Sequence, residues 1–189
     1  MKLEYKKKPK ILERKKIASS KLFKIESCQI VFSNGNERLY ECISPINNYQ
    51  KAVLIVPFLD NETLILIKEY SVGIEDYTLS FPKGSVDPGE DIFESANREL
   101  MEEAGYSSDN YEYLRDLYLS PNYMKQHISI VAAKNLKKKK IKGDEPEDLE
   151  VFPWKLSKIE NLINHPNFIE CRSFAALMLI WKKFLLLKK

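Results

Sequence analysis

The feature that most limits the fold of this chain is a loop rich in glycine and proline that runs directly into an amphipathic helix. Residues 82–91 hold three glycines or prolines after the first position and are predicted to form the loop. From residue 92 to residue 104, apolar side chains recur at helical spacing, which predicts a helix with one buried face. Gly105 is predicted to end this helix, because glycine adopts the left-handed cap conformation without a steric penalty.

The exposed face of the predicted helix carries an unusual group of charges. An α-helix turns by about 100° per residue, so Glu99 and Glu103 are expected one above the other, with Glu102 beside them. Like charges at this spacing destabilise a helix, whereas a bound divalent cation makes the arrangement favourable, and an all-oxygen donor set suits Mg²⁺ or Mn²⁺. Arg98 can orient these carboxylates, with Glu90 as a candidate partner. On the helix alone, an ordinary acidic surface helix is the competing interpretation.

The spacing across the whole segment resembles a known family signature. Gly84 is followed by five residues and Glu90, and then by seven residues and the run Arg-Glu-Leu-Met-Glu-Glu-Ala-Gly-Tyr at positions 98–106. This pattern is similar to the Nudix box, G-x5-E-x7-R-E-U-x-E-E-x-G-U, where U is an aliphatic or similar residue. Only Tyr106 departs from it, because it is aromatic. A match at so many spaced positions is far more specific than a short motif, and it favours the family over an ordinary acidic helix.

The resemblance to the Nudix family implies an α/β fold, in which a mixed β-sheet is sandwiched between α-helices. It also implies how the box would work. Glu90 and Arg98 would hold the metal-binding face in position and so belong to the catalytic set. The implied metal ligands are the carboxylates of Glu99, Glu102 and Glu103 and the main-chain carbonyl of Lys83.

A small antiparallel β module is predicted ahead of this domain. Strand-like runs at 22–33 and 37–44 flank Asn34 and Gly35, and an Asn-Gly pair between two strands is a strong hairpin signal. Residues 1–20 are polar and poorly patterned, which predicts a loose start. The module resembles the extra β domain through which ADP-ribose pyrophosphatases usually dimerise, and this resemblance implies a homodimer.

The remaining sequence has the alternating elements of an α/β domain. Two continuous apolar runs predict a hairpin whose strands are buried on both faces. A Ser-Lys-Ile-Glu capping box at 157–160 predicts the start of a helix that ends near residue 165. We predict strands at 52–59, 63–70, 78–81, 111–119, 127–133 and 150–154, a charged loop at 137–148 and a closing helix at 173–187. The predicted division is a β module over 1–46, with a connector at 44–50, and a Nudix domain over 47–189.

Two features outside the box resemble the ADP-ribose pyrophosphatase group. The acidic run 143–149 is similar to the loop that supplies the catalytic base in that group, which implies Glu145 as the base and Glu147 as the alternative. Pro121 stands about fifteen residues beyond the box, where a proline is typical of the same group. Tyr123 is similar instead to a tyrosine of the diadenosine polyphosphate hydrolases. Both residues are therefore predicted substrate contacts.

Lys68 and Glu69 close a strand beside the expected pocket. Related enzymes often use an Arg or a Lys-Glu pair there near substrate, and this resemblance implies that the two residues contact substrate. Runs at 21–27, 32–35, 64–70 and 143–147 are similar to bacterial Nudix enzymes that act on ADP compounds. This resemblance implies hydrolysis of ADP-ribose, NADH and diadenosine polyphosphates to AMP and a second phosphorylated product. A sensor that binds ADP-ribose without cleaving it is disfavoured, because the box is intact.

Charge and cysteine content narrow the possible partners. The net charge of +3 gives little support for nucleic-acid binding, although Lys137–Lys140 form a basic run. The most apolar segment is interrupted by lysines, which argues against a membrane span. Three cysteines without metal-ligand spacing indicate free thiols, and no signal peptide is visible. We therefore expect a cytoplasmic protein without a membrane partner.

Overall fold

The computed structural model describes residues 6–46 and 51–187. The chain forms two compact units. The first contains Met1–Gln50 together with the loop Tyr118–Gln126, and the second contains Lys51–Leu117 and His127–Lys189. Part of the predicted connector, residues 47–50, lies outside the described residues.

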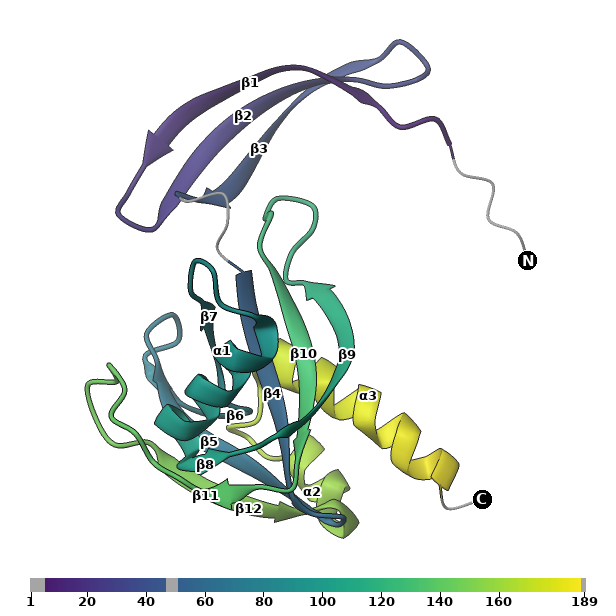
Figure 1. Ribbon diagram of the computed structural model, residues 1–189. Coiled ribbons are helices and arrows are strands. Elements are labelled where there is room, and N and C mark those ends of the chain that lie inside the picture. The colour runs from purple at the N-terminus through teal and green to yellow at the C-terminus, as the bar shows by residue number, and fades with distance from the viewer. Residues whose placement is uncertain (1–5, 47–50, 188–189) are drawn as a thin grey trace. The chain divides into compact units, whose positions relative to one another are not determined.

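The first unit is a three-stranded antiparallel sheet with the strand order β1-β2-β3 (Figure 1). The predicted hairpin is confirmed, and its turn residue Gly35 has a φ of 83°, which glycine adopts without strain. The predicted loose start is wrong, because residues 10–19 pair along β2. Every residue of this strand is exposed, so none of its positions has to be apolar. The sequence therefore lacks the alternation of apolar and polar residues that would have predicted a strand. The strands are β1 (Lys10–Ser19), β2 (Phe23–Val31) and β3 (Glu37–Pro45).

The second unit is built on a seven-stranded mixed sheet with the path β12-β5-β4-β10-β9, to which β6 adds beside β5 and β7 beside β4. Strands β4 and β10 run parallel, whereas β5 pairs antiparallel with β4, β6 and β12. All six predicted strands of this domain are confirmed. The strands are β4 (Lys51–Asp60), β5 (Thr63–Ser71), β6 (Asp76–Ser80), β7 (Lys83–Val86), β9 (Asn110–Tyr118), β10 (His127–Lys134) and β12 (Glu150–Lys155).

Helices cover both faces of this sheet, as the α/β prediction requires. The helices are α1 (Ile92–Glu99), the π-helix η1 (Leu100–Ala104), the 3-10 helix η2 (Leu156–Lys158), α2 (Ile159–Ile163) and α3 (Cys171–Leu187). No helix in the described part of the chain is long and apolar enough to cross a membrane.

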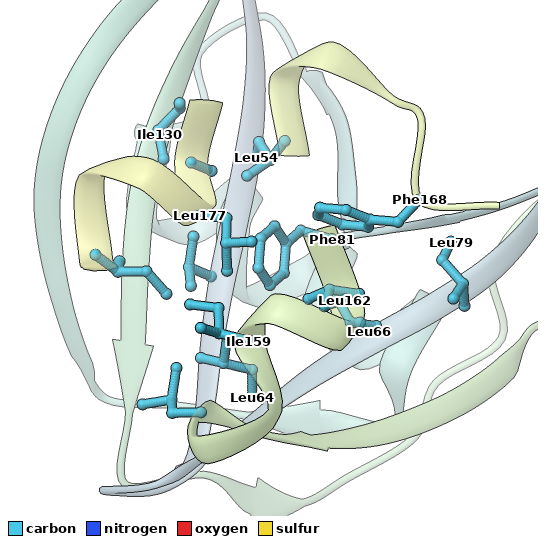
Figure 2. Packing of buried hydrophobic residues seen from close by; sticks show 14 of the residues in the cluster. Leu54, Leu64, Leu66, Leu79, Phe81, Ile130, Ile159, Leu162, Phe168 and Leu177 are labelled. Atoms are coloured by element: carbon cyan, nitrogen blue, oxygen red, sulfur yellow. The ribbon is translucent and has the colours of Figure 1, made fainter. Parts of the chain in front are cut away.

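Two apolar cores form because successive side chains of a strand point to opposite faces. On one face, Leu54 and Leu66 pack with Phe81, Phe168 and residues of α2 and α3 (Figure 2). On the other face, Val53 and Ile65 pack against α1 and η1. The box helix, which consists of α1 and η1, therefore packs against the sheet through its apolar side, and its acidic side remains available to bind a ligand.

Three local predictions need correction. The predicted loop 82–91 contains strand β7, which pairs with β4. The charged loop 137–148 begins with β11 (Lys137–Lys138), which pairs with β8 (Tyr106–Ser107). The capping box at 157–160 does not form, since buried Leu156 starts a 3-10 turn there and Lys158 precedes α2 without a side-chain cap.

Candidate active site

The box helix begins at a well-defined point. The carboxylate of Asp91 accepts a hydrogen bond from the Phe93 N–H at 2.8 Å, and the carboxylate of Glu94 accepts one from the Asp91 N–H at 3.0 Å. This reciprocal pair is a capping box, and it satisfies N–H groups that have no partner inside the helix. It therefore fixes where the helix starts after the loop.

The last turn of the box helix is a π-helix and not the α-helix predicted from the sequence. It runs from Leu100 to Ala104 and ends at Gly105, whose φ of 74° is the expected left-handed cap. The Gly105 N–H donates to the Leu100 carbonyl, five residues earlier. Glu103 therefore lies in a wider turn than the α-helix from which its position beside Glu99 was predicted. Such turns are frequent at functional sites.

Glu103 is buried at the base of the site. Its Oε2 accepts a hydrogen bond from the Lys83 N–H of β7 at 2.8 Å. Burial raises the pKa of Glu103 to about 8, and the negative charges of Glu69 and Glu99 also raise it, whereas Lys83 opposes the shift. A carboxylate held in this way is destabilised as an anion unless another positive charge reaches it.

Glu99 lies directly against the backbone of β7. A Cβ atom at Gly84 would come within 2.0–2.2 Å of the carboxylate atoms of Glu99, so only glycine leaves room for this side chain. The pKa of Glu99 is raised by burial, and the nearby Glu102 and Asp144 add to the effect. The first glycine of the box therefore provides the space that the Glu99 carboxylate occupies.

Arg98 connects the loop to the acidic face. Its Nε and Nη2 donate to the two oxygens of Glu90 at 3.0 and 3.1 Å, and Nη2 also donates to the Ser85 carbonyl at 2.9 Å. Its Nη1 donates to Glu99 at 2.7 Å and to Glu102 at 3.2 Å. The bond from Arg98 holds the pKa of Glu90 at about 2. The predicted contact between Glu90 and Arg98 is thus present. The guanidinium holds the Glu90 carboxylate of the loop and, at the same time, the Glu99 and Glu102 carboxylates of the helix.

A second group of charged side chains lies on strands β5, β7 and β12. Lys83 makes an ion pair with Glu69 of β5 and donates to Ser80 Oγ at 3.4 Å. Lys68 makes an ion pair with Glu150 at 2.8 Å, and its ammonium lies 5.1 Å from the centroid of the Tyr77 ring. The predicted Lys68–Glu69 pair is therefore split between two different ion pairs.

The loop that carries the predicted base lies next to the box helix. A cavity of about 460 Å³ is lined by Glu102 and by loop residues that include Glu145 and Glu147. Partial burial raises the pKa of Glu145, and the nearby charges of Glu69, Asp144 and Glu102 raise it further. The Tyr77 hydroxyl donates to Glu147 at 2.8 Å. Sequence reasoning did not identify Tyr77, whose position follows only from the pairing of β5 with β6.

The donor set fits a hard divalent cation. Glu99, Glu102 and Glu103 offer only oxygen, and their mutual repulsion would be relieved by a cation. Within the described ranges, no three metal-binding side chains converge on one point. Glu99 and Glu102 accept hydrogen bonds from Arg98, and Glu103 accepts one from the Lys83 N–H.

The two remaining predicted contacts lie in the other unit. Pro121 and Tyr123 belong to the loop of the first unit and line a cavity of about 500 Å³ there. The loop is joined to β3 by backbone bonds between Ile43 and Tyr123 at 2.6 Å and between Lys125 and Ile43 at 3.1 Å. Their predicted contact with substrate stays a prediction.

Comparison with known proteins settles the family. A model of the NUDIX domain matches residues 48–170, which include the whole acidic helix and the loop with Glu145. The chain belongs to the Nudix hydrolase family. A model of the NudE-type Nudix hydrolase N-terminal domain also matches residues 9–41 of this Nudix hydrolase.

Individual relatives cover nearly the whole Nudix hydrolase. ADP compounds hydrolase NudE of Escherichia coli (strain K12) is 44% identical over 178 residues, which span 93% of this chain and 94% of the relative. ADP-ribose pyrophosphatase of Bacillus subtilis (strain 168) is 23% identical, over 92% of this chain and 93% of the relative. A crystal structure of an ADP compounds hydrolase superposes with a TM-score of 0.86 at 40% identity, over 95% of this chain and 96% of that chain.

Proposed function

We propose that this Nudix hydrolase cleaves the pyrophosphate of ADP-linked compounds, namely ADP-ribose, NADH and diadenosine polyphosphates. The products would be AMP and a second phosphorylated compound. The proposal draws on the similarity to ADP compounds hydrolase NudE and to an ADP-ribose pyrophosphatase. The observation that carries it is the excess of carboxylates over cations in one region of the second unit. The carboxylates are Glu69, Glu99, Glu102, Glu103, Asp144 and Glu145, and the cations are Lys83 and Arg98.

Mg²⁺, or Mn²⁺ in its place, would be held by Glu99, Glu102, Glu103 and the Lys83 carbonyl. When bound, the metal supplies positive charge that neutralises the diphosphate and makes one phosphorus more electrophilic. Arg98 keeps Glu99 and Glu102 on one face, because it contacts both at 2.7 and 3.2 Å. Glu90 holds Arg98 in turn through two further bonds. These residues would thus arrange the ligands before substrate arrives.

Glu145 would act as the general base that takes a proton from the attacking water. Two observations favour it over Glu147. The pKa of Glu145 is raised by partial burial and by the nearby negative charges of Glu69 and Asp144, and a raised carboxyl pKa improves a base that works near neutral pH. Glu147 instead accepts a hydrogen bond from the Tyr77 hydroxyl at 2.8 Å, which ties its carboxylate to β6. We assign Glu147 to positioning the loop.

The proposed substrate contacts are Lys68, Glu69, Pro121 and Tyr123. Lys68 and Glu69 lie at the end of β5, where each already has an ion-pair partner that a polar substrate could replace. Pro121 and Tyr123 line the cavity of the first unit, whose aromatic residues Phe32 and Tyr40 suit a flat base.

The proposed assembly is a homodimer formed through the first unit. Its support is the number of apolar side chains exposed there, of which Leu39 is 70% exposed. Further exposed examples are Ile11, Leu12, Ile17 and Leu22. A cytoplasmic location is proposed from the three free thiols, which suit a reducing compartment. No membrane or nucleic-acid partner is proposed.

A substrate panel tests the reaction. Purified protein with Mg²⁺ would be incubated with ADP-ribose, NADH, diadenosine triphosphate and, as a control, ATP, and the products would be separated by chromatography. We expect AMP from the ADP-linked compounds and little turnover of ATP. Preferential release of pyrophosphate from ATP would overturn the substrate assignment and leave the family intact.

A further inference from the structure

Two cysteines of the first unit lie side by side on neighbouring strands. Cys28 is on β2 and Cys42 is on β3, and their sulfur atoms are 3.7 Å apart. The strand register pairs Cys28 with Tyr40 and Glu26 with Cys42, so the two cysteines are diagonal neighbours on one face of the sheet. Cys171 is in the second unit and is exposed.

The two thiols differ in their surroundings. Cys28 is only 4% exposed, and burial raises the pKa of its thiol. Cys42 is half-buried, and the Arg14 guanidinium lies 3.4 Å from its sulfur. Arg14 also lies across the strand register from Cys28, so the feature that distinguishes the two thiols is access: Cys42 is half-buried, whereas Cys28 is almost fully buried. Glu26 holds Arg14 in this position through an ion pair of 3.4 Å.

Small molecules have a route to both sulfurs. Cys28, Cys42 and Arg14 all line the cavity of about 500 Å³ in the first unit. A sulfur atom at a cavity wall is accessible to a small oxidant even when its residue is largely covered.

We propose that Cys28 and Cys42 are a reversible dithiol–disulfide pair that reacts with peroxides or small disulfides, with Cys42 as the attacking thiol and Cys28 as the resolving thiol. With hydrogen peroxide, the Cys42 thiolate attacks one oxygen and the O–O bond breaks. This oxidises the sulfur to a sulfenic acid and, with one proton taken up, releases water. The Cys28 thiol then attacks that sulfur, the S–O bond breaks, and a second water leaves. In total, two thiols and one peroxide give one disulfide and two waters. With oxidised glutathione, the Cys42 thiolate attacks one sulfur and releases one glutathione, and Cys28 then displaces the second, so that two thiols and one small disulfide give one protein disulfide and two glutathione thiols.

The required movement is small. A disulfide has a sulfur–sulfur distance of about 2.0 Å, so the two sulfurs must approach by roughly 1.7 Å from their separation of 3.7 Å. Side-chain rotation together with a small shift of β2 against β3 would supply this approach, because diagonal neighbours are about 7–8 Å apart whereas the Cα atoms of a disulfide are usually about 4.4–6.8 Å apart.

The test uses the full-length chain with Cys171→Ala, so that only the two paired thiols remain. The protein is exposed to hydrogen peroxide or to oxidised glutathione, free thiols are alkylated, and peptides are mapped by mass spectrometry without reduction. We expect a cross-linked peptide that joins residues 28 and 42 and that disappears after dithiothreitol. Intact thiols, or oxidation of Cys42 to sulfinic acid without a cross-link, would overturn the proposal.

Variants separate the roles of the two thiols. In Cys28→Ala, a sulfenic acid reagent should label Cys42, and in Cys42→Ala it should leave Cys28 unlabelled. The reverse pattern would overturn the assignment of the attacking thiol. Arg14→Met should slow the reaction with peroxide by about tenfold, the scale expected for removing one contact charge. Lys15→Met is the matched control, because it removes the same charge from the opposite face of β1 and should leave the rate unchanged. Equal rates in both variants would exclude a role for Arg14.

Discussion

Replacing Glu103 with Gln should stabilise the metal-free protein while removing most of its activity. The pKa of this carboxyl is about 8 in the folded protein and 4.5 in the reference state. The folded chain therefore holds the proton more tightly than the unfolded chain, so stability is lost as pH rises from 4.5 towards 8. At pH 7 the accumulated penalty is at most roughly 3 kcal/mol, from about 1.4 kcal/mol per pH unit.

Glutamine keeps the size of the side chain and can still accept from the Lys83 N–H, but it carries no charge. With EDTA at pH 7, we expect Glu103→Gln to gain about 1–2 kcal/mol, or a melting temperature higher by about 2–8 °C. The gain should shrink at pH 5, because this pH is only slightly above the unfolded-state pKa of 4.5 and little of the penalty has accumulated there. With Mg²⁺ the ranking should reverse, since the variant lacks one of the proposed ligands, and kcat should fall by about 10²-fold or more.

Thermal unfolding with EDTA and with Mg²⁺, together with steady-state kinetics, measures all of these effects. Glu62→Gln is the matched control, because Glu62 is exposed on the turn between β4 and β5. It should change neither the melting temperature nor turnover. Near-normal turnover of Glu103→Gln at saturating Mg²⁺, or a lower melting temperature with EDTA, would refute the reasoning.

Three further predictions follow from other parts of the structure. Glu145→Gln should lower kcat by about 10²–10⁴-fold with little change in KM, and Glu147→Gln should have a smaller effect; steady-state kinetics that gave the reverse order would move the base to Glu147. Deletion of residues 1–46 should convert a dimer into monomers or aggregates with weaker substrate binding, and a soluble, fully active monomer in light scattering would contradict this. The pKa of Glu26 is lowered to about 2 by bonds from Ser44 and Lys125, so its contribution to stability should be present above about pH 4.5 and be lost as pH falls towards 2. Chemical denaturation across this range should show the loss in the wild type and not in Glu26→Gln; equal curves would argue against it.

The parts of the fold that the sequence predicts are those with a buried face. The two cores contain the apolar runs of β4 and β5, and one of them also contains the periodic apolar side of the box helix. The strands and this side of the helix were predicted correctly. Strand β1 was missed because its residues are all exposed, and its place depends on backbone pairing with β2, which leaves no pattern in side-chain polarity.

The residues of the site were easier to predict than their geometry. The box spacing identifies Glu99, Glu102 and Glu103, but no side-chain pattern distinguishes a π-turn from an α-turn, so the true orientation of Glu103 could not be predicted. The bond between Tyr77 and Glu147 joins positions 70 residues apart. Such a contact depends on the register of β6 and on the course of the loop, which single-sequence periodicity does not define.

The central claim is that the crowded carboxylates of the box helix hold a divalent cation for cleavage of an ADP-linked pyrophosphate. The most direct measurement is ADP-ribose turnover before chelation, after removal of metal with EDTA, and after Mg²⁺ is restored, in the wild type and in Glu103→Gln. We expect EDTA to abolish formation of AMP and ribose 5-phosphate, Mg²⁺ to restore it in the wild type, and the variant to stay nearly inactive throughout. Turnover of the wild type that persists unchanged in EDTA would contradict the account.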